Sequence, residues 1–274
     1  MTPQKDQIST TQEVHSEQLS IQEIINSINR LDIKLLDIAD KAKELKLDSL
    51  KDSRMLFIRY ITELNSVTTF QLSFQAESSS KLEDKNWIKE RLPHLSQRIE
   101  AISDIKTYSN NRNKNISKHI RECFFLGYFN EFETRIRSLV RKIGYVENVY
   151  STKNRNILNG NESFYLIYRG LYESYLHFDK SDYEVLKIFS AIRNTVHNSG
   201  FYFPIDRKNK TFLYKNKAYH FHHGDPVSFL NFNLMETIQM DLLSLFSKTI
   251  NDERIKSIKV IEDPISNVKF VGTE

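Results

Sequence analysis

Residues that interrupt helices and form tight turns are scarce in this chain, which has only 7 glycines and 5 prolines among 274 residues. Sheet-rich architectures need such residues at their frequent turns, whereas long helices need few of them. Hydrophobic residues make up 39% of the chain and aromatic residues 12%, which is too apolar for a disordered protein. The composition therefore predicts a folded protein of the all-α class.

Charge is distributed unevenly along the chain, whose formal net charge is +4. Residues 1–110 carry 15 basic and 17 acidic side chains, and the remaining residues carry 24 basic and 18 acidic ones. We therefore expect an anionic partner to bind the C-terminal part. The alternative is an ordinary solvated surface, because dedicated DNA-binding proteins carry a larger surplus.

Location and redox state are indicated by what the sequence lacks. Residues 1–16 are polar, predict a disordered leader and do not read as a signal peptide, and no stretch has the roughly 18 apolar residues of a membrane span. Cys123 has no second cysteine to pair with, and its neighbours Phe124 and Phe125 predict a buried thiol. We expect a cytoplasmic protein that does not associate with membranes.

The sequence predicts a helical N-terminal region over residues 17–108. Apolar residues from Ile21 to Leu45 recur at alternating spacings of three and four, which is typical of a bundle helix or of a coiled-coil arm. The bundle is favoured because more helices follow: one from about Leu50 to Phe74, and short ones on either side of Pro93 up to Tyr108.

A second domain is predicted over residues 109–258, after the polar run Ser109–Asn115. Its expected helices are Ile116–Ile143 with Gly144 as C-terminal cap, Glu162–Leu176, a helix from Ser181 or Asp182 to Gly200, and Leu234–Ile250 with an Asn233/Glu236 capping box. Between the last two, about 201–223, the hydrophobic period changes to two and predicts a small β-hairpin. Residues 259–274 are expected to be an irregular tail.

The run A-I-R-N-T-V-H-N-S-G-F-Y-F, residues 191–203, is the most informative for chemistry. Arg193 and His197 are one helical turn apart and share a face, and Asn194 and Asn198 repeat this spacing beside them. Metal-independent phosphodiester cleavage needs such a pair, because arginine stabilises charge on the phosphoryl oxygens while histidine moves the proton of the sugar hydroxyl.

This run follows F-x-E-F-E-T-R-I-R-S-L-V on a long helix, and together they resemble the HEPN superfamily over about Ile116–Ile255. The resemblance implies a small helical bundle that pairs as a homodimer, and many members are metal-independent endoribonucleases of toxin and antiphage systems. It places the catalytic site at Arg193, Asn194 and His197. Three residues separate Arg193 from His197, fewer than the four to six usual in the family, so the alternative is a non-catalytic HEPN-like interaction or RNA-binding module.

Asn198, Glu133 and Arg137 are candidates for residues that support the site. Glu133 and Arg137 are one turn apart on the long helix and either orient the catalytic pair or form a surface salt bridge. Single-stranded RNA is expected to contact hairpin cations that alternate with Phe212, Tyr214 and Tyr219, unless the hairpin is merely solvated. These cations are Arg207, Lys208, Lys210, Lys215 and Lys217.

Metal and cofactor chemistry have little support in the sequence. His220, His222 and His223 with Asp225 resemble a zinc site only weakly, because two histidines at most share a strand face and no cysteine pattern accompanies them. Nucleotide-binding glycine loops and a hydrolase nucleophile elbow do not occur. We expect no cofactor. The prediction is a metal-independent endoribonuclease of a bacterial defence or toxin system, with a defence-system partner protein, and a coiled-coil scaffold is a third class.

Overall fold

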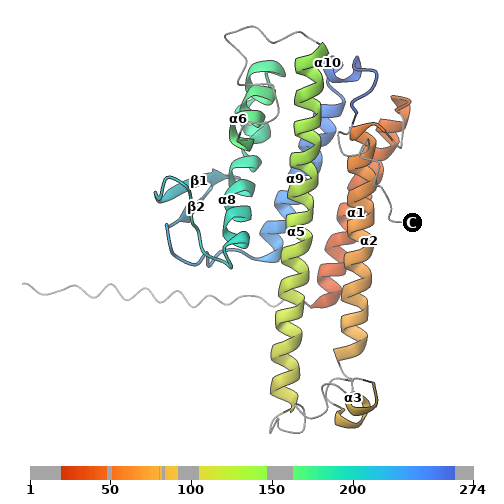
Figure 1. Ribbon diagram of the computed structural model, residues 1–274, viewed down its shortest axis with the longest axis vertical. Helices are drawn as coiled ribbons and strands as arrows, with labels where there is room; N and C mark the ends of the chain where they lie inside the picture. The colour runs from red at the N-terminus through yellow and green to blue at the C-terminus, as the bar shows by residue number, and fades with distance from the viewer. Residues whose placement is uncertain are drawn as a thin grey trace, which may run out of the picture.

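The computed structural model describes residues 20–47, 51–79, 81, 84–91, 105–146 and 163–262. They form a mostly helical fold with one small antiparallel sheet, which confirms the predicted helical class and the hairpin (Figure 1). The elements are α1 (Ile21–Glu44), α2 (Ser53–Ser79), α3 (Lys85–Arg91), α5 (Ile105–Val146), α6 (Phe164–Arg169), the π-helical η3 (Gly170–Tyr175), α7 (Lys180–Tyr183), α8 (Val185–His197), β1 (Lys210–Tyr214), β2 (Lys217–Phe221), α9 (Phe232–Ile250) and α10 (Glu253–Lys256).

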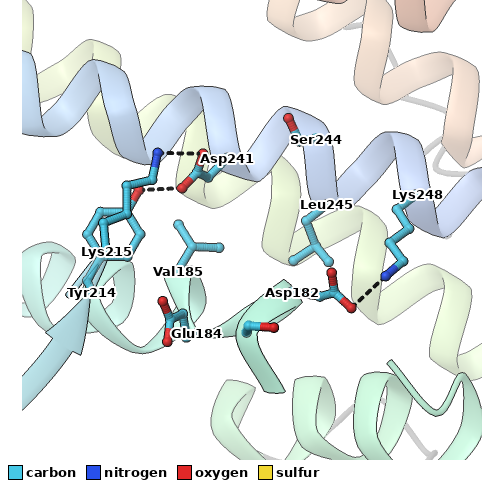
Figure 2. Close-up of a pocket in the computed structure, with 10 residues that line it drawn as sticks. Asp182, Glu184, Val185, Tyr214, Lys215, Asp241, Ser244, Leu245 and Lys248 are labelled. Atoms are coloured by element: carbon cyan, nitrogen blue, oxygen red, sulfur yellow. Dashed lines mark hydrogen bonds and ion pairs between the residues drawn. The ribbon is translucent and has the colours of Figure 1, made fainter. Parts of the chain in front are cut away.

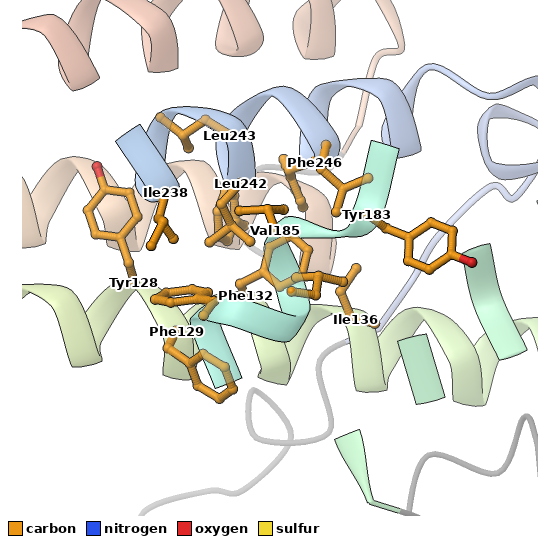
Figure 3. Close-up of a cluster of buried hydrophobic side chains, with 14 of the residues drawn as sticks. Tyr128, Phe129, Phe132, Ile136, Tyr183, Val185, Ile238, Leu242, Leu243 and Phe246 are labelled. Carbon is orange, nitrogen blue, oxygen red and sulfur yellow. The ribbon is translucent and has the colours of Figure 1, made fainter. Parts of the chain in front are cut away.

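The long helix α5 runs through the middle of the molecule (Figure 1). Helices α1 and α2 lie on one side of it, whereas α6, α8 and the hairpin lie on the other. Helix α9 contacts α1, α5 and α8, so it joins the two sides. Figure 3 shows the resulting core, to which α5 contributes Phe132 and α9 contributes Leu242 and Phe246. None of the helices in the described ranges is long and apolar enough to span a membrane.

Helix α1 shows how the sequence pattern becomes structure. Ser20 caps it in a reciprocal capping box with Glu23. The predicted apolar positions from Ile24 to Ala42 are buried, and the helix contacts α2 and α9, so the bundle interpretation of this helix is confirmed. Arg30 adds an ion pair to Glu236 of α9, at 2.7 Å between Nε and Oε1. The contact holds the pKa of Glu236 below its usual range, although burial of the carboxyl opposes this.

Helix α5 continues without a break through Ser109–Asn115, so the predicted start of this helix at Ile116 is wrong. Asn111, Lys114 and Asn115 are exposed on this helix, where polar side chains cost little. Gly144 lies inside the helix and is no cap. Cys123 is exposed, in contrast to the expected burial. The N-terminal helices share one core with the rest of the described chain, and we see no separate N-terminal unit in it.

Two Asp-x-Arg motifs fasten helix ends to each other. Asp52 accepts hydrogen bonds from the backbone and guanidinium of Arg54, which donates in turn to the carbonyls of Ile255 and Ile258. Asp252 and Arg254 repeat this arrangement at the start of α10, where Arg254 donates to Tyr175 and Leu176 at the end of η3. The arginines thereby satisfy helix-end carbonyls of other segments.

Several predicted boundaries shift. Helix α2 runs five residues beyond Phe74, the predicted 162–176 helix ends in the π-helical turns of η3, and a short α7 precedes α8. The cap of α9 is Asn231, whose side chain accepts from Leu234 N, and Asn233 is already helical. Residues 201–205 form only one bridge, Phe201 to Pro226, and no strand. The leader 1–16, the segment around Pro93 and the tail beyond residue 262 lie outside the described residues.

Candidate functional site

The candidate site lies where α8 ends. Its apolar positions are buried against the core up to Thr195, and the last turn presents polar side chains. Asn198 closes the helix by donating its side-chain amide to the Asn194 carbonyl at 2.7 Å. The chain then reverses at Gly200, whose φ of 97° belongs to the left-handed region that glycine adopts without strain. This reversal returns residues 201–203 alongside the end of α8.

Arg193 is half-buried, and its guanidinium carbon lies 4.8 Å from the ring centroid of Phe129 on α5. This cation–π contact fixes the side chain against the core. The Nε atom is buried and has no hydrogen-bond partner among the residues that the structure describes. In contrast, Arg54, Arg135 and Arg137 each pair with a carboxylate. Within the described ranges Arg193 makes no ion pair, and the glutamates of α5 nearest in sequence to Phe129, Glu131 and Glu133, pair with Arg135 and Arg137 instead.

His197 follows one turn later and is exposed. Around an ideal helix, the side chains of Arg193 and His197 are about 40° apart, so both lie on the same face of α8. Both residues thus lie in the last turns of α8, with the Arg193 guanidinium packed on Phe129 and the His197 side chain exposed.

Asn194 has a different task from the one implied by the HEPN resemblance. Its Oδ1 accepts from Phe203 N at 3.0 Å, and its Nδ2 donates to Phe203 O at 3.2 Å. Both polar atoms of the amide are thus engaged with the backbone of one residue. Asn194 holds the segment after Gly200 against the end of α8.

Phe201 and Phe203 are functional candidates that sequence reasoning missed. They are 40% and 46% exposed, while Tyr202 between them is buried. Their rings lie 24° from parallel with centroids 6.3 Å apart, and the edge of His223 meets Phe203. The alternation of apolar residues over 201–205 in the sequence predicts a strand, and it gives no sign that Phe201 and Phe203 form an exposed pair.

Glu133 and Arg137 form a salt bridge along α5, in which Arg137 Nε donates to Glu133 Oε1 at 2.9 Å. Both side chains are about four-fifths buried. The structure shows no hydrogen bond or ion pair between this salt bridge and Arg193 or His197, within the ranges it describes.

The hairpin cations divide into two groups. Lys210 pairs with Asp206 and Lys215 with Asp241, at 2.9 and 3.0 Å. Arg207, Lys208 and Lys217 have no carboxylate partner in the described part of the chain. The aromatic residues expected to stack on RNA are unsuited to it, since Tyr214 and Tyr219 are buried and Phe212 is half-buried against the core.

The histidines of the hairpin do not form a metal site. His220 Nδ1 shares a hydrogen bond with Thr211 Oγ1 at 2.9 Å across the two strands. No group of three or more histidine, cysteine, aspartate or glutamate side chains that could hold a metal ion occurs among the residues with described positions.

A polar cleft of about 340 Å³ lies between α7, the start of α8, β1 and α9 (Figure 2). Its charges are largely neutralised within the protein: Lys248 pairs with Asp182, and Asp241 accepts from Lys215 and from the Tyr214 hydroxyl. Burial, followed by the bond to Asp241, raises the pKa of Tyr214. These contacts brace the hairpin and α7 against α9, and Glu184 is the cleft carboxylate without such a contact among the described residues.

We compared the chain with models of protein families, with curated proteins and with solved structures, and none of them matches it. The site is therefore interpreted from its geometry.

Proposed function

We propose that this protein is a metal-independent endoribonuclease that binds single-stranded RNA at the C-terminal end of α8. One observation carries the proposal: Arg193 is a half-buried cation without a carboxylate partner in the described structure, one turn before the exposed His197. Buried charges are normally paired. An unpaired guanidinium is suited to a phosphodiester, which offers it two oxygen acceptors.

The chemistry assigned to the pair is transesterification. The ribose 2′-oxygen attacks the adjacent phosphorus, the P–O5′ bond breaks, and a 2′,3′-cyclic phosphate and a 5′-hydroxyl result. Arg193 stabilises the negative charge that develops on the phosphoryl oxygens. His197 takes the proton of the 2′-hydroxyl or gives one to the leaving 5′-oxygen. A second copy of the chain in a homodimer supplies the imidazole for the other transfer.

The biological setting belongs to the same proposal. The resemblance of residues 191–200 to HEPN ribonucleases supports a toxin or antiphage role in bacteria, in the cytoplasm and with a partner protein that controls the activity. The unpaired Arg207 and Lys208 support an anionic substrate, since both lie exposed within a few residues of Phe203.

The test is cleavage of a labelled single-stranded RNA in the presence of EDTA. His197→Ala should lower the cleavage rate by about 10²- to 10⁴-fold, as expected for loss of a general acid or base. Arg193→Ala should do the same, and circular dichroism should show unchanged helix content. His222→Ala is the matched control, because His222 is also exposed but lies on the hairpin.

Two outcomes contradict the proposal. Cleavage that survives in both site variants removes Arg193 and His197 from the mechanism. Cleavage that EDTA abolishes shows dependence on a metal ion and directs attention to His220, His222 and Asp225.

A second function, a non-catalytic RNA-binding module, is favoured by Asn194. Its amide is fully engaged with Phe203, so it does not face a substrate as a member of the catalytic set would. RNA binding that depends on Arg193 without any cleavage identifies this alternative.

A further inference from the structure

We propose that Phe201 and Phe203 form a stacking platform for the bases of single-stranded RNA, and that Asn194 positions this platform beside Arg193 and His197. The inference rests on the proposed function, because it assumes that RNA is the ligand of the site. Beyond the proposed function, it states that the two aromatic residues recognise the bases of the RNA and that Asn194 is a positioning residue.

The first support is the exposure of planar surface. The side chains of residues 201–203 alternate between exposed and buried. Tyr202 is the buried one, and its ring packs on Phe221 with ring centroids 4.9 Å apart. Phe201 and Phe203 are instead both exposed, and their ring planes lie 24° from parallel. In single-strand binding proteins, each nucleobase that covers an aromatic face strengthens binding by about 5- to 150-fold.

The second support is rigidity. On one side, Tyr202 N donates to Asp225 O at 3.1 Å and Gly224 N donates to Tyr202 O at 2.9 Å. On the other side, Asn194 binds both backbone groups of Phe203. The segment is thus held along both edges although it is no strand. A platform fixed in this way loses little conformational entropy when a base stacks on it.

The third support is charge, which favours RNA over an apolar protein partner. The segment that carries the aromatic pair is hydrogen-bonded to Asn194, the sequence neighbour of Arg193, and the exposed Arg207 and Lys208 follow the segment in sequence. A phosphate backbone carries one negative charge per nucleotide, so cations close to a base-stacking surface suit a strand that crosses the pair. Bases in a duplex are stacked on each other and cannot cover Phe203, which predicts a preference for single strands.

The experiment measures binding of a fluorescent 12-nucleotide single-stranded RNA, and of the same sequence as a duplex, to the full chain. Phe203→Ala should weaken single-strand binding by tenfold or more. Phe203→Tyr should retain the affinity, because the ring remains. Leu213→Ala is the matched control: Leu213 is an exposed apolar residue of the hairpin without an aromatic ring.

A direct readout comes from Phe203→Trp, whose fluorescence single-stranded RNA should quench upon stacking. Asn194 is tested by kinetics. As a positioning residue, Asn194→Ala should raise KM as Phe203→Ala does and leave kcat within a few-fold. A catalytic Asn194 would instead lower kcat at saturating RNA.

The outcomes separate this inference from the proposed nuclease. Wild-type affinity in Phe203→Ala, with cleavage still dependent on His197, overturns the platform alone. Weakened binding in Phe203→Ala, with cleavage unaffected by Arg193→Ala and His197→Ala, overturns the nuclease alone. Absence of RNA binding by the wild-type chain overturns both. A change of mass in solution caused by Phe203→Ala, without a change in RNA affinity, identifies the pair as a self-association surface instead.

Discussion

At the scale of single residues, the site depends on how Phe129 holds Arg193. The ring packs on Phe189 at 4.8 Å and on Phe164 at 5.3 Å between centroids, and its face also carries the guanidinium. An arginine without a carboxylate partner is otherwise free to rotate, and rotamer freedom would weaken its hold on a phosphate. Phe129 therefore links the hydrophobic core to the proposed chemistry.

Phe129→Leu is expected to affect both the stability of the core and the hold on Arg193, which two assays measure separately. Loss of the ring should destabilise the fold by about 1–2 kcal/mol through its aromatic contacts. It should also lower the rate of RNA cleavage, because Arg193 loses its cation–π partner. Urea unfolding gives the first quantity and a single-turnover assay gives the second.

Phe125→Leu is the control for this prediction. Phe125 is buried and meets Phe189 edge-on at 4.6 Å, and it makes no cation–π contact with Arg193 in the described structure. A similar loss of stability with an unchanged cleavage rate is expected. Equal effects of both substitutions on cleavage would show that Phe129 acts through general packing only.

At the scale of elements, the Asp-x-Arg motifs explain why short and distant segments stay in place. Asp52 and Arg54 are nearly completely buried, and the Asp52 carboxylate also accepts from Ile261 N at 3.1 Å. The pair thus fastens the end of the described chain to the start of α2. The second motif is more exposed, and the hydrogen bonds from Arg254 hold the pKa of Asp252 below its usual range.

Arg54→Met should be strongly destabilising. It leaves the Asp52 carboxylate buried without its cation and removes the donors to Ile255 and Ile258, so a loss of about 3–5 kcal/mol is expected in urea unfolding at neutral pH. Arg59→Met on the same helix is the control. Arg59 pairs with Glu63 at the surface, where such a pair contributes less than about 1 kcal/mol. Equally small losses of stability in both variants would contradict the role of the Asp52–Arg54 pair in fastening these segments.

The sequence predicts elements well where one face is continuously apolar. The apolar series of α1 and the inner face of α9 correspond to buried residues in the structure. Prediction failed at Ser109–Asn115, where polar residues of low helix propensity lie within α5 and neighbouring contacts such as Gln75 to Ser117 help to keep the helix intact. Contacts with a helix that is distant in sequence cannot be inferred from the local amino-acid composition.

The candidate site could be predicted from the sequence only where it depends on the spacing of residues along one helix. Arg193 and His197 share a helix face through sequence spacing alone, and the structure retains this. The bonds from Asn194 to Phe203 were not predictable, because they depend on the chain reversal at Gly200 and on the backbone contacts to residues 224–227. Pattern analysis identifies which face a residue occupies, but not which loop returns to meet it.

At the scale of the whole molecule, the described helices share one core. Phe57 of α2 packs against Phe246 of α9 with ring centroids 3.9 Å apart, and Tyr128 of α5 donates to Asn65 of α2 at 2.9 Å. Asn65 donates in turn to Asp32 of α1. Burial of the Asp32 carboxyl raises its pKa, although the bond from Asn65 opposes this. Apolar and polar contacts therefore both cross the boundary that the sequence suggested.

A fragment that begins at Ile105 should consequently fail to fold as an independent domain. Removal of α1 and α2 exposes the apolar faces of α5 and α9 and leaves Glu236 without Arg30 and Ser27. We expect the full chain to unfold in one cooperative transition in urea, and the fragment to aggregate or to show a broad transition with exposed hydrophobic surface. Circular dichroism and dye binding measure these properties. A soluble fragment that unfolds cooperatively would contradict the single core and restore the two-domain division, because a domain is defined by a core that is sufficient for its own stability.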